Sequence, residues 1–179
     1  ASGLIDTLSV EGGAVEVKIE TNAVLRGAVH PVLERVVRPV VQNEFGFASA
    51  NLLSPEDVYA GKLVAALDRQ HPRDLFDVMQ LFGHEGITPN IRRAFVVYLA
   101  SHNRPVHEVL FPALRDITTD YNNNFAGMTT EPVALDDLLA ARERMVQELQ
   151  AGLDETERKF LISLVAAKPA IISSNSGVP

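Results

Sequence analysis

Pro72 separates two short helical patterns, and this single residue constrains the fold more than any other feature of the chain. The stretch around it, residues 53–86, reads LSPEDVYAGKLVAALDRQHPRDLFDVMQLFGHEG. Ser54 can cap the first helix, and Arg73 and Asp74 open the second. Because proline disrupts a helix interior, the two helices must join through a tight turn. The sequence therefore predicts a helical hairpin here.

Each helix of the predicted hairpin has an apolar side that a protein core can bury. The residues predicted to be buried are Val58, Leu63, Val64 and Leu67 on the first helix and Leu75, Val78, Leu81 and Phe82 on the second. The polar sides carry opposite charges. Lys62 and Arg69 are seven residues apart and so project from one face, while Asp74 and Asp77 are three apart and can also point the same way.

Two interpretations of this charge stay open. Cations beside a carboxylate pair could serve a phosphate and its metal, as phosphoryl and nucleotidyl transfer require. Alternatively, Lys62 or Arg69 forms interhelical salt bridges with Asp74 or Asp77, which would only stabilise the hairpin. The density of charge around one turn, which includes Arg73, favours a function, because surface ion pairs contribute little to stability.

The residues before the hairpin indicate a small sheet. Residues 14–22, AVEVKIETN, alternate apolar and polar side chains and predict a strand. Residues 1–13 and 45–52 can supply further strands. Residues 29–43 contain two prolines and many valines, and predict irregular structure with extended pieces near 36–41.

The residues after the hairpin indicate helices. Helices are expected over 88–101, 105–117 and 135–149, with a loop at 122–130, and a last helix begins at Asp154, where Glu157 completes a capping box. Arg92 and Arg93 are expected to face solvent. The fold class is α+β: a small mixed or antiparallel sheet followed by a helical bundle. The expected domains are a sheet region at 1–53, a helical domain at 54–166 and a flexible tail at 167–179.

Composition excludes several classes of protein. With 46% hydrophobic residues a sizeable core is possible, and the net charge of −7 opposes nucleic-acid binding through overall charge, although a local basic groove could exist. The sequence has no cysteine, no P-loop, no GxSxG motif and no zinc-type histidine spacing. It has no membrane-length apolar run, and its first residues do not resemble a signal peptide. A cytoplasmic location is expected.

Three short motifs resemble a known family. KLVAALDR at 62–69 and PRDLFD at 72–77 look like the two C-terminal motifs of AbiEii/AbiGii-type toxin nucleotidyltransferases, and VKIE at 17–20 looks like their middle motif. These proteins belong to the polymerase-beta-like nucleotidyltransferase superfamily. The resemblance implies Mg²⁺ and an NTP, an acceptor such as tRNA, and membership of a toxin–antitoxin or abortive-infection system with an antitoxin protein as a possible partner.

The resemblance also assigns roles to individual residues. The positions that it places at the nucleotide are Lys18, Glu20, Lys62, Arg69 and Arg73, and those that it places at the acceptor, in a catalytic role, are Asp77 and Asp74. Judged by the strand pattern alone, Glu16, Lys18 and Glu20 form a solvated polar face. No metal ligand is assigned within this chain.

One motif of the superfamily is missing from the sequence. Its metal site needs a Gly-Ser-type loop followed by an Asp-x-Asp pair that holds two Mg²⁺ ions, and the chain contains no such pair. The missing part is expected upstream of Ala1, so that the chain is either a fragment or a degenerate member, inactive in metal-dependent transfer on its own. The alternative is a non-catalytic helical module that binds a partner protein or an antitoxin, and a plain structural domain is a third interpretation.

Overall fold

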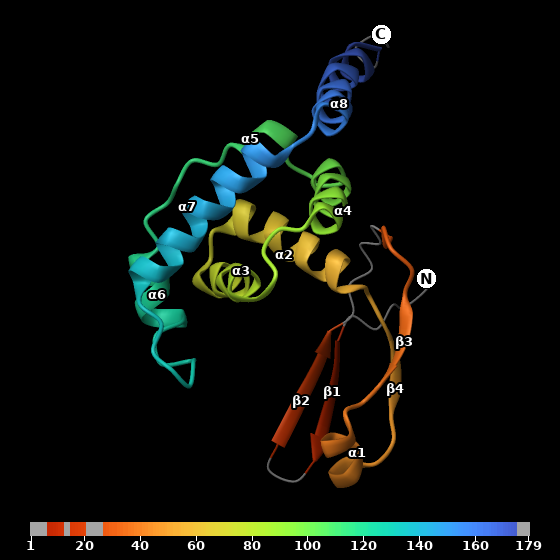
Figure 1. Ribbon diagram of the computed structural model, residues 1–179, viewed down its shortest axis with the longest axis vertical. Helices are drawn as coiled ribbons and strands as arrows, with labels where there is room; N and C mark the ends of the chain where they lie inside the picture. Colours follow the sequence, from red (N-terminus) through yellow and green to blue (C-terminus); the bar gives the residue numbers. More distant parts are fainter. Residues whose placement is uncertain (1–6, 13–14, 21–26, 175–179) are drawn as a thin grey trace, which may run out of the picture.

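A computed structural model describes residues 7–12, 15–20 and 27–174, with side chains for Ser9 and for residues 27–166. The elements in chain order are β1 (Thr7–Gly12), β2 (Val15–Glu20), β3 (Leu33–Val36), α1 (Pro39–Phe45), β4 (Ser49–Leu52), α2 (Pro55–Arg69), α3 (Pro72–His84), α4 (Pro89–Ala100), α5 (Val106–Leu110), α6 (Thr118–Asn124), α7 (Leu135–Gly152) and α8 (Glu155–Ser174). Strands come before the main helices (Figure 1), which confirms the α+β class.

The strands form two separate antiparallel pairs, β1 with β2 and β3 with β4. In the first pair Val10 lies opposite Val17, and the strand predicted over 14–22 is confirmed as β2. In the second pair Leu33 lies opposite Leu52. Figure 1 shows both pairs below the helical part, with α1 at the far end of the β3–β4 arm.

The extended structure predicted near 36–41 is wrong, because β3 ends at Val36 and α1 begins at Pro39. The valines favour a strand, but Pro39 occupies the first helical position, where its fixed φ suits a helix and its missing N–H costs nothing. The helix ends at Phe45, and the residue that caps it, Gly46, has a φ of +90°, which glycine adopts easily. The following strand begins only at Ser49.

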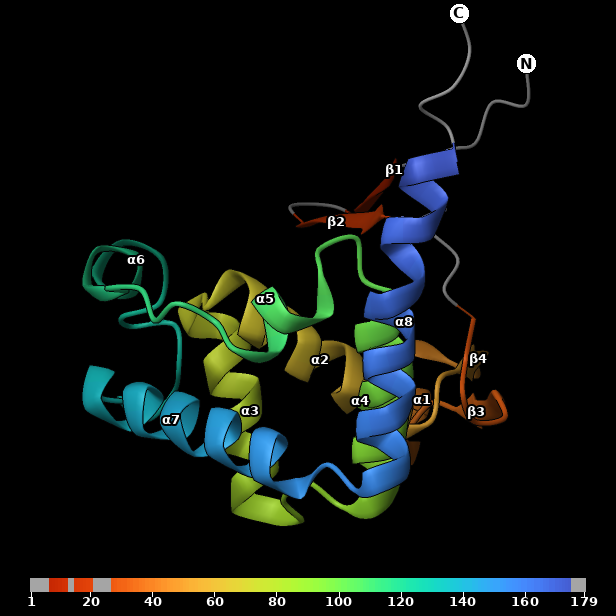
Figure 2. The ribbon, with the colours of Figure 1, turned by 90° about the horizontal axis from the view of Figure 1, so that it is seen from above.

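The hydrophobic core lies among the helices. Helix α2 packs against α3 and α4, and α7 lies along α3. Phe95 on α4 is fully buried at the centre, together with Leu63 and Leu67 from α2 and Leu75 from α3. The prediction that Val58 is buried is wrong: this residue, in the first turn of α2, is 39% exposed. Figure 2 shows α8 running beside α4.

Helix caps follow the sequence closely. The Oγ of Ser54 accepts the N–H of Asp57 at 3.1 Å, as the cap prediction requires. At the start of α8, Asp154 and Glu157 each accept the other's backbone N–H at 2.8 Å, which confirms the capping box. Glu157 also accepts from Arg92 on α4, with 3.0 Å between Nε and Oε2. The expectation that Arg92 faces solvent is therefore wrong, since it ties α4 to α8.

Two predictions for the segment between α4 and α7 are wrong. The helix expected over 105–117 ends at Leu110, because Pro112 lacks the N–H that another turn needs, and Leu114 is 53% exposed. The loop expected at 122–124 is part of α6. Phe125 stabilises that helix by packing its ring 5.6 Å from the ring of Phe76 on α3, a contact that no local pattern reveals.

Asp57 connects the β3–β4 arm to the helical core. Its carboxylate is 1% exposed and accepts the backbone N–H groups of Val29 at 2.7 Å and His30 at 2.9 Å, and the hydroxyl of Ser54 at 2.9 Å. Burial by itself raises the pKa of Asp57, but these hydrogen bonds outweigh it and hold the pKa below its ordinary value. The carboxylate is therefore ionised and fixes where residues 29–30 join α2.

Helix α8 extends to Ser174, so residues 167–174, which the sequence assigns to the tail, have a helical backbone. Within the described residues no helix is both long enough and apolar enough to cross a membrane.

Candidate functional site

The α2–α3 hairpin brings its cations and carboxylates together in two pairs. The Lys62 ammonium donates to the Asp77 carboxylate at 2.5 Å, and both side chains are more than one third exposed. One turn of α3 closer to the bend, Arg69 donates to both oxygens of Asp74, at 3.0 Å from Nε and 2.7 Å from Nη2. The salt-bridge interpretation therefore describes the observed contacts, and both pairs remain accessible to a solute.

Gln70 shapes the bend between the two helices. Its φ of +51° is left-handed, which allows α2 to end at Arg69. Its buried amide donates to the carbonyl of Ala113 at 2.9 Å and accepts from the backbone N–H of Arg115 at 3.0 Å and from Arg142 at 3.2 Å. The hairpin is thereby fastened to the chain segment between α5 and α6.

Arg142 is the buried member of this network. It donates to the carbonyl of Arg115 at 2.8 Å, and its Nε has no hydrogen-bond partner among the described residues. Burial lowers the pKa of its guanidinium, and the charges of Glu143 and Asp116 partly restore it. Arg142 is thus a structural cation that holds the segment containing Arg115 against the hairpin.

A polar pocket of about 530 Å³ opens at the bend. Its lining residues are Asp68, Arg69, His71, Arg73, Asp74, Arg115 and Asp120. Of the residues predicted from the sequence, Arg69, Arg73 and Asp74 meet in this pocket. Lys62 and Asp77 do not line it and lie farther from the bend.

Two predicted nucleotide contacts stay untested. The backbones of Lys18 and Glu20 lie on β2, opposite Ser9 and Thr7. The side chains of Lys18 and Glu20 lie outside the described residues. Whether they reach the same site as Lys62 and Asp77 therefore remains a prediction.

Sequence reasoning missed several residues of the pocket. Asp68 and His71 lie within the predicted hairpin, and their nearness to the bend is the signal that could have found them. Arg115 and Asp120 lie more than thirty residues after the end of α3, and no spacing in the sequence links them to the hairpin. The His71 side chain caps α3 by accepting the N–H of Arg73 at 3.2 Å.

The hairpin by itself does not fit a complete magnesium site. Mg²⁺ prefers several oxygen ligands in octahedral geometry, but Asp74 and Asp77 are each held by a cation on α2. Across the described residues, no three acidic or histidine side chains come together as metal ligands do. What the hairpin offers is cationic charge for a phosphate and a carboxylate beside each cation, of which Asp77 is 36% and Asp74 is 13% exposed.

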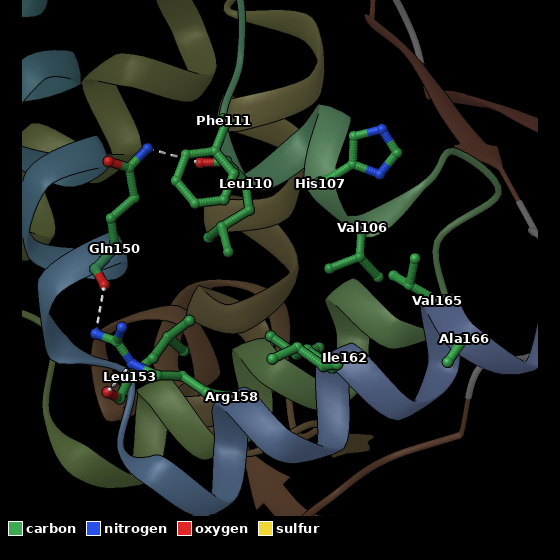
Figure 3. A pocket seen from close by; sticks show the side chains of 11 residues that line it. Val106, His107, Leu110, Phe111, Gln150, Leu153, Arg158, Ile162, Val165 and Ala166 are labelled. Carbon is green, nitrogen blue, oxygen red and sulfur yellow. Dashed lines mark hydrogen bonds between the residues drawn. The ribbon is translucent and has the colours of Figure 1, made fainter.

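A second pocket, of about 520 Å³, is an apolar groove between α5, α7 and α8 (Figure 3). Phe111 and Ile162 line it and are more than 60% exposed. Two of its polar members are engaged: Gln150 donates to the carbonyl of Leu110 at 2.9 Å, and Arg158 donates to that of Leu153 at 2.9 Å. Apart from these two side chains and the imidazole of His107, the lining is apolar, so the groove suits an apolar surface.

The charged hairpin offers cations for a phosphate, and comparison with known families assigns the class of protein. A family model described as "Nucleotidyl transferase AbiEii toxin, Type IV TA system" matches residues 4–173, nearly the whole chain. The chain therefore belongs to the AbiEii toxin family. Neither curated proteins nor solved structures gave a match.

Proposed function

We propose that this chain takes part in the transfer of a nucleotide from an NTP to an acceptor such as tRNA. The single observation that supports the proposal best is the Lys62–Asp77 pair, in which an exposed ammonium is held 2.5 Å from a carboxylate on the neighbouring helix. Membership of a nucleotidyl transferase toxin family makes a triphosphate the natural ligand of that ammonium. Such transferases generally use Mg²⁺, which would neutralise triphosphate charge.

In this proposal Lys62 binds a phosphate of the NTP, and Arg69 adds cationic charge about two turns further along the same face of α2. Asp77 orients Lys62 before the NTP arrives and, with Asp74, positions the hydroxyl of the acceptor. Arg73 lies beside both carboxylates in sequence and contributes to the same region. Lys18 and Glu20 are proposed to border the nucleotide from β2.

The function can be tested through nucleotide binding and through label transfer. The purified chain is titrated with each NTP in the presence of Mg²⁺, and transfer of label from the NTP to bulk tRNA is measured in parallel. We expect NTP binding that Lys62→Met weakens at least tenfold. Because the sequence contains no Asp-x-Asp pair, we expect no efficient transfer by the 179-residue chain alone.

Two results would contradict these expectations. If Lys62→Met binds NTP as tightly as the unchanged chain, the hairpin is not the nucleotide site. Efficient transfer by this chain alone would show that the reaction does not need an upstream metal motif. Sequencing the gene upstream of the codon for Ala1 provides an independent check, since a Gly-Ser loop and an Asp-x-Asp pair are expected there.

A second candidate function is non-catalytic binding of a partner protein, and the apolar groove favours it. Exposed apolar side chains such as Phe111 and Ile162 suit the apolar face of a peptide helix. An antitoxin encoded by a neighbouring gene is the partner to try first, by co-expression and co-purification. Ile162→Glu should abolish such a complex, whereas retention of the complex would exclude the groove. A cytoplasmic location remains a prediction.

A further inference from the structure

We propose that Arg115, together with Arg73, binds a backbone phosphate of the polynucleotide acceptor in the pocket at the α2–α3 bend. The proposal rests on the proposed function, since it adds an acceptor site to the nucleotide site at Lys62. It concerns a residue that lies outside every motif of the sequence. Arg115 lies between α5 and α6, and only the folded chain places it beside the hairpin.

The pocket lining carries three arginines and three aspartates, but two of the arginines have no ion-pair partner among the described residues. Asp74 is bound on both oxygens by Arg69, and Asp68 is bound by Arg104, with 2.5 Å between Nη1 and Oδ1. Among the described residues, the side chains of Arg73 and Arg115 donate only to backbone carbonyls, those of Asn124 at 3.3 Å and Arg69 at 3.4 Å.

Within the described part of the chain, no carboxylate lies within ion-pair distance of Arg73 or Arg115. Asp120 is the remaining acidic residue of the pocket lining. The guanidinium groups of Arg73 and Arg115 are therefore available to form charge-assisted hydrogen bonds with an anionic ligand.

The backbone of Arg115 is held in place before any ligand binds. Its N–H donates to Gln70 at 3.0 Å, and its carbonyl accepts from Arg142 at 2.8 Å. Gln70 and Arg142 are both buried, so this support is shielded from water. The Arg115 side chain is exposed and extends from this fixed backbone toward the pocket. Preorganisation of this kind reduces the entropy lost on binding.

The chemistry of the pocket suits a phosphodiester. A guanidinium presents paired N–H groups that match two phosphate oxygens, and arginine is the residue of choice for nucleic-acid backbones. The pocket also lies at the N-terminus of α3, where the helix dipole favours an anion. The pocket is polar and open, as a site that binds the backbone of a nucleic-acid strand must be. Lys62, the proposed NTP contact, lies outside its lining, so the two anions have separate places.

The test compares RNA binding with NTP binding for the same set of variants. Fluorescence anisotropy measures the affinity of the full chain for end-labelled tRNA between 50 and 200 mM salt, a range over which phosphate contacts weaken strongly. The variants are Arg115→Gln, Arg115→Lys and Lys62→Met. Arg93→Gln on α4 is the matched control, because Arg93 is an exposed arginine that lies outside the pocket lining.

We expect Arg115→Gln to weaken tRNA binding about fivefold or more and to reduce the slope of log affinity against log salt by about one. The tRNA affinity of Arg115→Lys should lie between that of the unchanged chain and that of Arg115→Gln, because lysine keeps the charge but lacks the paired N–H groups of the guanidinium. Arg93→Gln should stay within about twofold of the unchanged chain. Thermal unfolding of each variant shows that the fold is intact.

Several outcomes would overturn the proposal. The first is an unchanged tRNA affinity in Arg115→Gln, and the second is an equal loss of tRNA affinity in Arg93→Gln. The third is a loss of NTP affinity in Arg115→Gln as large as its loss of tRNA affinity, which would make the pocket a nucleotide site. Failure of the proposed function looks different: tRNA binding would depend on Arg115 while no NTP binding is detected. Loss of NTP binding in Lys62→Met with tRNA binding retained supports both proposals.

Discussion

Lys62 and Asp77 lie fifteen residues apart in the sequence and only 2.5 Å apart in space, across the two helices of the hairpin. Pro72 and the left-handed Gln70 make this possible by folding α3 back along α2. Because both side chains are more than one third exposed, water screens their attraction. The pair therefore contributes little to stability, and we propose that it serves to bind a phosphate.

Exchanging the charges of this pair separates a structural role from a functional one. In the double variant Lys62→Asp/Asp77→Lys, the interhelical attraction is restored with opposite polarity. We expect thermal stability close to that of the unchanged chain, but NTP binding at least tenfold weaker, because the ammonium now projects from α3. NTP binding at the original affinity would assign the pair a role in stability alone.

The buried carboxylate of Asp57 predicts a pH dependence of stability. Its pKa in the folded chain is below the ordinary value of about 3.9. The stabilisation is therefore fully present above pH 3.9 and is lost as the pH falls through the lowered folded pKa. Urea unfolding measured between pH 2 and pH 7 should show this loss.

Asp57→Asn is the control for that measurement. It cannot ionise, and its amide provides one acceptor oxygen where the carboxylate provides two for Val29, His30 and Ser54. We expect a loss of roughly 1–3 kcal/mol at neutral pH and a flatter profile below pH 5. A profile as steep as that of the unchanged chain would assign the acid sensitivity to other carboxylates.

Gln70 provides a test of how the hairpin is fastened. Gln70→Ala leaves the Ala113 carbonyl and the Arg115 N–H without this partner and removes a neighbour of the buried Arg142. Chemical denaturation should show a loss of roughly 1–3 kcal/mol. Gln147→Ala, at an exposed position of α7, should stay within about 0.5 kcal/mol.

The helical core is predicted to depend on Phe95. Its side chain is fully buried, so Phe95→Ala leaves a cavity and should cost about 3–5 kcal/mol of unfolding free energy. Phe111, which is 62% exposed in the apolar groove, is the matched control. Phe111→Ala should change stability by no more than about 0.5 kcal/mol. Equal losses at the two positions would contradict the assignment of the core.

Local patterns identified most of the framework correctly. Ser54, Thr88 and Asp154 cap the predicted helices, since a cap depends only on the few residues that follow it. Alternation over residues 14–22 gave β2, because the period of two is itself a local property. Two segments whose structure was predicted wrongly contain prolines: Pro39 starts a helix among valines, and Pro112 ends a helix earlier than predicted.

Long-range contacts were beyond the sequence patterns. The sequence pattern around Arg92 does not predict its contact with Glu157, which lies sixty-five residues later. Asp57 reads as an ordinary first-turn acid, although it holds residues 29–30. Such contacts depend on the way helices pack, and a single sequence does not encode that packing in any short spacing.

The sequence by itself determined the hairpin, its charges and the family motifs, because spacing along a helix fixes which side chains share a face. It left open whether those charges pair, and with which partners. Only the tertiary structure decided that Lys62 meets Asp77 and that Arg115 joins the bend. The physical reason is that a buried network, Gln70 with Arg142, must satisfy its hydrogen bonds with whichever segment packs against it.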